Sequence, residues 1–275
     1  MAFSVNTNKG AFAALQNLTV TNANLEKTQN QINTGLKVAS SKDNAAVFAI
    51  AQTLRADVSG LNAAKSSLDR ALSTIDVAVA AGEAVSDLLI EMKEKAVSAK
   101  DTSLTSSSRT SLNDDFTQLR DQIQSIVENA EFNGLNAVKD STSNIVAITN
   151  DDGSATITVS AQNLSLGSSN VKIASNQSIS TTTAASDTVT KLESSIKKVN
   201  SSLSVLGAGA KRLELQQEFV GKLSDTIEVG IGNLVDADLA KTSANLQSLQ
   251  VKQQLGLQAL SIANQAPQAI TSLFQ

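Results

Sequence analysis

Apolar residues recur every seven positions along two long stretches of this chain, and this repeat restricts the fold more than any other feature. The first stretch reads Val47, Leu54, Leu61, Leu68, Ile75, Leu89 and Ala96, with Gly82 at the one remaining position. The second reads Val199, Leu206, Leu213, Val220, Ile227 and Leu234. A seven-residue repeat keeps an apolar seam on one side of a helix and favours side-by-side packing of long helices. One unbroken helix over the first stretch would be roughly 75 Å long, at about 1.5 Å per residue.

The composition agrees with long, closely packed helices. The 275 residues include a single proline, Pro267, and no Cys, His, Trp or Tyr. The core must therefore be built from Leu, Ile, Val and Ala, which suits close helix packing. The net charge of -4, with 22 dispersed basic residues, argues against a nucleic-acid-binding protein.

Neither membrane insertion nor a cleaved secretion signal is expected. The longest apolar run, 45–51, is far shorter than the roughly 20 residues that span a bilayer. The first residues lack the charged and apolar regions of a signal peptide.

The candidate catalytic and metal-binding motifs are weak, and we expect neither an enzyme nor a cofactor. Three acidic pairs, Asp114-Asp115, Asp151-Asp152 and Asp236/Asp238, have no His or Cys beside them to complete a transition-metal site. They fit helix caps, turns and solvated faces better. The segment 207–211, Gly-Ala-Gly-Ala-Lys, faintly resembles a phosphate loop, but it lies inside the second repeat and favours close helix packing.

The order of patterns predicts a mainly α fold, in which long antiparallel helices form a coiled-coil-like bundle with a small β-hairpin patch. Helical spacing runs over 11–36, 47–96, 112–130 and the second repeat, and a last helix follows residue 238. Asn133-Gly134 is expected to end the third helix. The polar insert at 141–186 contains two short β-type runs around 150–153, a β-hairpin signal.

Both ends of the chain are nearly free of charge. Lys252 is the only charged residue from 242 to 275, and residues 1–40 carry only Lys9, Glu26, Lys27 and Lys37. Helices this apolar and uncharged are normally covered by a partner. The two ends are therefore candidates for an assembly surface.

Several motifs resemble those of bacterial flagellins. The N-terminal motifs are Val5-Asn6-Thr7-Asn8, Ile32-Asn33-Thr34-Gly35-Leu36-Lys37-Val38, Lys42-Asp43-Asn44-Ala45-Ala46 and Ala130-Glu131-Phe132-Asn133-Gly134-Leu135-Asn136. The C-terminal motifs are Asp236-Ala237-Asp238-Leu239-Ala240 and Leu260-Ser261-Ile262-Ala263-Asn264-Gln265-Ala266-Pro267-Gln268. They occur in order across most of the chain. With only a short polar insert in the middle, the chain resembles the short flagellins of alphaproteobacteria.

The resemblance implies a structural subunit that polymerises into the flagellar filament for motility. Residues 1–40 with 236–275 would form the inner tube, and 41–235 the outer tube. Members of this family are exported unfolded by a flagellum-specific apparatus to an extracellular filament, where they also meet hook-associated and cap proteins. The inner-layer residues expected to carry self-assembly are Leu15, Leu18, Leu25, Ile32, Leu246, Leu249, Leu260, Ile270 and Phe274. Some related flagellins carry O-linked sugars in the region that corresponds to 141–186.

Two positions of the second helix depart from the flagellins that the vertebrate flagellin receptor detects. Glu91 stands where an important Arg is expected, and Lys95 stands where a Leu is expected. A reversed charge and a charged residue at an apolar contact both weaken binding, so we expect weak receptor stimulation. An ordinary i,i+4 ion pair on a solvated face explains the same two residues equally well.

Two alternative functions stay open on sequence grounds. A hook–filament junction protein would share the terminal layers but normally has a more divergent middle. A cytoplasmic coiled-coil signalling rod would also be Ala/Ser-rich and heptad-patterned, yet it predicts no β patch and leaves the uncharged ends unexplained.

Overall fold

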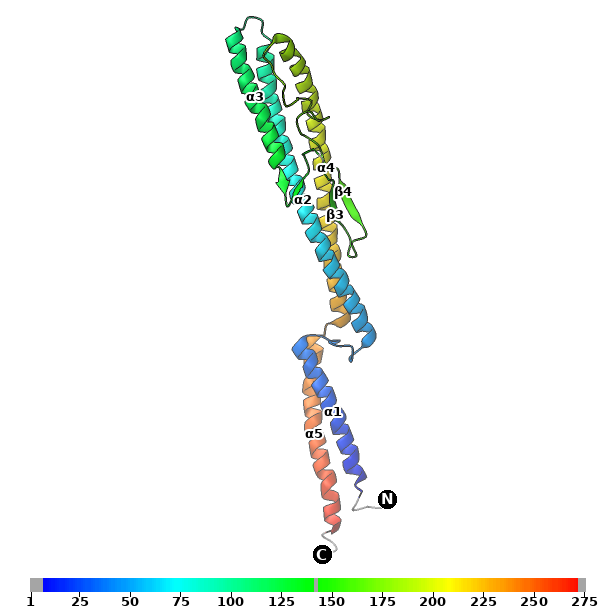
Figure 1. Ribbon diagram of the computed structural model, residues 1–275. Helices are drawn as coiled ribbons and strands as arrows, with labels where there is room; N and C mark the ends of the chain where they lie inside the picture. The colour runs from blue at the N-terminus through cyan, green and yellow to red at the C-terminus, as the bar shows by residue number, and fades with distance from the viewer. Residues whose placement is uncertain (1–6, 141–142, 272–275) are drawn as a thin grey trace. The chain divides into compact units, whose positions relative to one another are not determined.

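The computed structural model describes the backbone of residues 7–140 and 143–271, and the side chains as far as residue 265 (Figure 1). Five helices dominate these residues, and two short antiparallel strand pairs accompany them. The helices are α1 (Lys9–Thr34), α2 (Ala45–Ala99), α3 (Ser106–Asn129), α4 (Thr182–Val235) and α5 (Leu239–Thr271). The predicted fold class is confirmed. No helix of the described part is long and apolar enough to cross a membrane.

The chain divides into two compact units. Residues 1–56 and 226–275 form one, called here the terminal unit, and residues 57–225 form the other, the central unit. Because α2 and α4 each pass from one unit to the other, the division falls within these two helices. It does not coincide with the breaks between α1 and α2 or between α4 and α5.

The first seven-residue repeat forms the buried seam of α2. From Leu61 to Ala96 every position of the repeat is buried, whereas Val47 and Leu54 nearer the start of the helix are half-buried. A second buried row follows three residues behind the first, as in a heptad pattern. Its members are Ala64, Ala71, Ala78, Val85, Met92 and Ala99.

α2 and α4 run antiparallel within the central unit (Figure 1). Ser86 Oγ donates a hydrogen bond of 3.3 Å to Asn200 Oδ1, and farther along α2 Lys93 Nζ lies 3.0 Å from Glu193 Oε1. Gly82 marks a close approach, since a Cβ added there would lie 2.8 Å from Leu203 Cδ2. Gly82, the one position of the repeat without an apolar side chain, is therefore where the Leu203 side chain of the facing helix fills the space that a side chain on α2 would occupy.

α3 packs back against the end of α2. Thr105 caps its N-terminus by accepting a hydrogen bond of 3.1 Å from the Ser108 N–H. Arg109 Nε donates to the Ala99 carbonyl at 3.0 Å, which satisfies a free carbonyl at the C-terminus of α2. Phe116 and Ile123, both fully buried, lie at the helical spacing that the sequence predicts.

The expectation that Asn133-Gly134 ends the third helix is wrong. α3 ends at Asn129, and the dipeptide forms the two-residue turn between β1 (Glu131–Phe132) and β2 (Leu135–Asn136). Both turn residues have positive φ, 51° for Asn133 and 82° for Gly134. Asn-Gly is the preferred sequence for this kind of hairpin turn, so the same dipeptide supports a different structure.

The predicted hairpin within the polar insert is confirmed. β3 (Ile145–Ile148) pairs antiparallel with β4 (Thr156–Val159), and alternate residues on each strand are buried. Ser67 Oγ of α2 accepts a hydrogen bond of 3.1 Å from the Ile148 N–H. On α4, a Cβ added to Gly209 would lie 2.6 Å from Val159 Cγ1. The Gly-Ala-Gly segment lies inside α4 and is not a phosphate loop, and at Gly209 it packs closely against the hairpin, where the sequence suggested close helix packing or a local kink.

The rest of the insert, 160–181, is a packed strap although its composition is polar. Four of its side chains are fully buried: Leu164, Val171, Ile173 and Ile179. Buried hydroxyls on α4 hold it: the Lys172 N–H donates to Ser195 Oγ at 2.9 Å, and Gln177 Nε2 donates to Thr188 Oγ1 at 2.7 Å. On α4, each of these two hydroxyls comes three residues after a buried apolar position. A search for apolar periodicity alone does not reveal them.

Candidate assembly surface

α1 is a well-defined helix although its sequence is polar and carries few charges. Asn8 Oδ1 accepts a hydrogen bond of 3.1 Å from the Ala11 N–H at the N-terminus, and Gly35 ends the helix in the left-handed conformation with a φ of 72°. Threonine hydroxyls along the helix donate to the carbonyl four residues earlier. These threonines are Thr19, Thr21, Thr28 and Thr34.

α5 lies antiparallel beside α1 in the terminal unit (Figure 1). Asn8 Nδ2 donates a hydrogen bond of 2.6 Å to the Ala263 carbonyl, and Gln253 Nε2 donates one of 2.8 Å to Asn22 Oδ1. At Gly256 the helices approach closely, since a Cβ there would lie 3.3 Å from Leu18 Cδ1. The polar contacts between these two helices are thus hydrogen bonds of amide side chains, whereas ion pairs are common on most solvated helix surfaces.

The residues predicted to carry assembly occupy different environments. Leu18 is buried against α5. Leu15 is 49% exposed, and the other predicted residues with described side chains are half-buried, namely Leu25, Ile32, Leu246, Leu249 and Leu260. The side chain of Ile270 and the whole of Phe274 lie outside the described residues.

Large apolar side chains are more exposed on this helix pair than the sequence pattern indicates. On α1 they are Phe12, Leu15 and Val20, and on α5 they are Leu239, Val251, Leu255, Leu257 and Ile262, with exposed fractions from 49% to 64%. Two helices can cover only one stripe of each other, so the remaining apolar positions stay accessible. The nearly uncharged sequence was the signal that could have located them.

Few charges accompany this apolar surface. In the part of α5 beyond Lys241, Lys252 is the one charged residue, and α1 contains only Lys9, Glu26 and Lys27. Exposed apolar area without charges around it is unusual for a monomer in water and is typical of a protein–protein interface.

A short antiparallel bridge holds the two connections of the terminal unit together. Lys37 N–H donates to the Val235 carbonyl at 2.6 Å, and the Ala237 N–H donates to the Gly35 carbonyl at 2.8 Å. In the following loop, the N–H groups of Ser40 and Ala39 donate to the Asp43 carboxylate, and these hydrogen bonds hold the pKa of Asp43 below its usual value.

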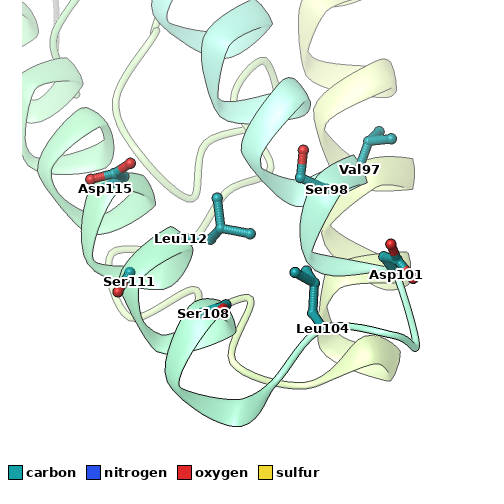
Figure 2. Close-up of a pocket in the computed structure, with 8 residues that line it drawn as sticks. All are labelled: Val97, Ser98, Asp101, Leu104, Ser108, Ser111, Leu112 and Asp115. Carbon is teal, nitrogen blue, oxygen red and sulfur yellow. The ribbon is translucent and has the colours of Figure 1, made fainter.

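A hollow of about 720 Å³ opens at the far end of the central unit, between the end of α2 and the start of α3 (Figure 2). Leu104 and Leu112 form its apolar part, and Asp101 and Asp115 lie on its polar side. Asp101 Oδ1 accepts a hydrogen bond from the Ser103 N–H, and Asp115 is bound by Lys95. Both carboxylates are thus engaged within the fold. Across the described residues, no group of three or more potential metal ligands occurs.

Glu91 and Lys95 do not form the i,i+4 ion pair that the sequence allowed. Lys95 Nζ lies 2.8 Å from Asp115 Oδ2 on α3, and the hydrogen bond with Asp115 raises the pKa of Lys95. Glu91 is exposed. Both residues lie off the buried seam of α2.

Two family models match this chain and cover most of its length. The bacterial flagellin N-terminal helical region matches residues 5–143, and the bacterial flagellin C-terminal helical region matches residues 189–274. The chain belongs to the bacterial flagellin family. The two matches contain the paired α1 and α5 and the motifs that carried the resemblance.

Full-length relatives agree with this membership. The chain is 49% identical to flagellin FljN of Caulobacter vibrioides over 99% of its own length and 98% of that protein. It is 35% identical to a flagellin of Brucella melitensis, with 99% of each chain covered. This flagellin is accordingly a short, alphaproteobacterial-type structural subunit of the flagellar filament, and the alternative of a hook–filament junction protein is not favoured.

Solved structures show the same fold. A crystal structure of Bacillus cereus flagellin has a TM-score of 0.50 and 21% identity, and it covers 56% of this chain and 88% of that one. A putative flagellar hook-associated protein from Vibrio parahaemolyticus has a TM-score of 0.57 and 14% identity, and it covers 70% of this flagellin and all of that chain.

Proposed function

We propose that the paired ends of this flagellin, residues 1–40 and 236–275, form the inner layer of the filament and hold its subunits together. Residues 41–235 form the outer layer. The observation that carries this proposal is the exposed apolar surface of α1 and α5, which has almost no charge around it. Such a surface is stabilised when further copies cover it.

The energetics favour polymerisation through this surface. Covering one large apolar side chain contributes roughly 1.5–3 kcal/mol, and eight such side chains are exposed among the described side chains of α1 and α5. Part of this gain offsets the loss of translational and rotational freedom on association. A contact between different surfaces of successive copies extends into a helical filament when the rotation between copies does not close a ring.

The partners and location of this flagellin follow as parts of the same proposal. The export apparatus passes the chain unfolded to the cell exterior, and the absence of cysteine removes any disulfide that would hinder this passage. Hook-associated and cap proteins meet the filament at its two ends.

Deletion of residues 250–275 tests the proposal. The truncated chain loses most of α5 but keeps the whole central unit. We expect circular dichroism to show that the central helices remain folded, and sedimentation to show no polymer. The full-length protein, under the same salting-out conditions that favour apolar burial, should give long uniform filaments in the electron microscope. Filaments of normal length from the truncated chain would refute the proposal.

A further inference from the structure

The turn between β1 and β2 exposes a chemically labile dipeptide. Asn133 is the only Asn in the sequence that a Gly follows. Both residues of the turn are exposed, and a Cβ added to Gly134 would meet no atom within 4 Å. The backbone nitrogen after Asn133 therefore has neither a side chain nor a neighbouring element to shield it.

The side chain of Asn136, just after the turn, is engaged in hydrogen bonds, whereas that of Asn133 in the turn is not. Asn136 Nδ2 donates to the Val127 carbonyl at 2.8 Å, and its Oδ1 accepts from the Val138 and Lys139 N–H groups, both at 2.9 Å. Within the described residues, neither the Asn133 carboxamide nor the Gly134 N–H forms a hydrogen bond. The carboxamide is free to rotate towards the main chain.

We propose that Asn133 is a site of spontaneous deamidation in this flagellin. The Gly134 nitrogen attacks Cγ of Asn133, a new C–N bond closes a five-membered succinimide, and the Cγ–Nδ2 bond breaks. The amide proton of Gly134 leaves with Nδ2 as ammonia. Water then opens the ring at either carbonyl and yields Asp or isoAsp, without oxidation or reduction. Hydroxide removes the amide proton first, so the rate rises with pH.

A second turn of the same chain supplies an internal comparison. Asp152-Gly153 is also exposed, and Gly153 also has a positive φ, 74°. The Asp152 carboxylate, however, accepts hydrogen bonds from the Ser154 N–H, at 3.0 Å, and from Asn150 Nδ2. An ionised and tethered carboxylate is a poor electrophile, so ring closure at Asp152 is slow.

The two products differ in their effect on the fold. Asp at position 133 keeps the main-chain length and tolerates the left-handed conformation. IsoAsp adds one main-chain carbon to a two-residue turn that fixes the strand register. Just after β2, the Ala137 and Val138 carbonyls accept hydrogen bonds from Gln162 and Leu164 of the strap, at 2.9 and 2.7 Å. A displaced β2 therefore loosens the attachment of the strap.

Peptide mapping by mass spectrometry tests the proposal on the folded, full-length protein. After incubation in mildly alkaline buffer and digestion at acidic pH, the peptide with Asn133 should convert to Asp and isoAsp several-fold faster than peptides with Asn150 or Asn163. Conversion should accelerate with pH, and isoAsp should stay absent at Asp152. Asn133→Gln, which closes a six-membered ring only slowly, should stay unconverted.

The Asn133→Asp variant separates the effect of the new charge at position 133 from the effect of the extra main-chain carbon in isoAsp. It should melt at the wild-type temperature, whereas aged wild-type protein enriched in isoAsp should melt lower. Retention of Asn133 in the folded protein, with conversion only after unfolding in urea, would overturn the proposal. Conversion to Asp alone would also overturn it, because ring opening at either carbonyl must give both products.

Discussion

The two units of this flagellin are both built around an antiparallel helix pair, yet they differ in how much of their apolar surface is buried. In the central unit, α2 and α4 are joined by α3, the hairpin β3–β4 and the strap, and the seam from Leu61 to Ala96 is buried. In the terminal unit only α5 covers α1, and most large apolar side chains of the pair stay exposed. The number of covering elements, more than sequence hydrophobicity, decides which surface remains available to another molecule.

Charge separates the units in the same direction. The exposed Leu215 and Phe219 of the central unit lie among ion pairs of α4, Lys211 with Glu214 and Lys222 with Glu218. Apart from Leu239, which has Asp238 and Lys241 near it, the exposed residues of α5 have only Lys252 near them in sequence. The central unit therefore has a surface suited to water, and the terminal unit has an apolar surface of the kind that a protein partner covers.

Placing a charge in the buried seam should have the largest effect. Leu213→Asp or Leu61→Asp puts an unpaired carboxylate into a site that is at most 3% exposed. We expect a loss of about 4 kcal/mol or more, against a total stability of about 5–15 kcal/mol. Urea unfolding followed by circular dichroism measures it. Leu215→Asp, two residues from Leu213 but 57% exposed, is the control and should unfold near the wild-type midpoint.

Polar substitutions on the terminal unit should abolish assembly without affecting the fold. Val251→Ser combined with Leu255→Ser removes two exposed side chains of α5, so monomer stability should change by about 0.5 kcal/mol or less. Sedimentation should show little or no polymer. The matched pair Leu215→Ser and Phe219→Ser should still form filaments, and an equal loss in both variants would contradict the difference between the units.

Two glycines of one α4 segment should respond in opposite directions. An Ala at 209 brings its Cβ within 2.6 Å of Val159 Cγ1, whereas an Ala at 207 meets nothing within 4 Å. We expect Gly209→Ala to destabilise the central unit by about 1–3 kcal/mol and Gly207→Ala to stabilise it by about 0.5–1 kcal/mol. Urea midpoints measure both. Equal midpoints would mean that the hairpin does not pack closely on α4.

The flagellin-receptor prediction concerns the exposed face of α2. We expect Glu91 and Lys95 to reduce potency in a receptor reporter assay about tenfold or more, equivalent to about 1.4 kcal/mol of binding. Glu91→Arg should recover part of the loss because it restores the charge found in detected flagellins. Full potency of the unmodified protein would refute the prediction.

The smallest effect is expected at the ion pair between α2 and α3. Lys95 and Asp115 are both partly exposed, with side-chain exposures of 34% and 56%. Lys95→Met should therefore cost only about 0.2–1 kcal/mol, measured as a shift in the urea midpoint that high salt reduces. A loss as large as that of Leu213→Asp would show that Lys95 supports the buried core.

The helices and their buried faces could be predicted because periodic burial leaves a periodic sequence. Leu68, Ile75 and Leu206 are completely buried where the seven-residue repeat places them. The strap could not be predicted in the same way. Leu164, Val171 and Ile173 have no regular spacing, and the hydroxyls that hold their backbone, such as Ser195, look like ordinary polar residues until the strap lies on them.

The assembly surface was only partly predictable, for a related reason. Helical spacing identifies the apolar side of α1, but it cannot tell whether a residue faces α5 or solvent. Leu18 faces α5 and Leu15, three residues earlier, is half exposed. The ion pair of Lys95 with Asp115 was missed because it joins residues on different helices, whereas sequence spacing revealed only the nearer Glu91.

The hydrogen bond from Asn8 to the Ala263 carbonyl joins residues 255 positions apart. Contacts between such distant residues form late, since the intervening chain must first be ordered or brought together. A chain that stops before α5 leaves α1 without its partner helix, however well its middle folds. The helix pair that we propose as the contact between subunits therefore forms only in a chain that has been made through α5.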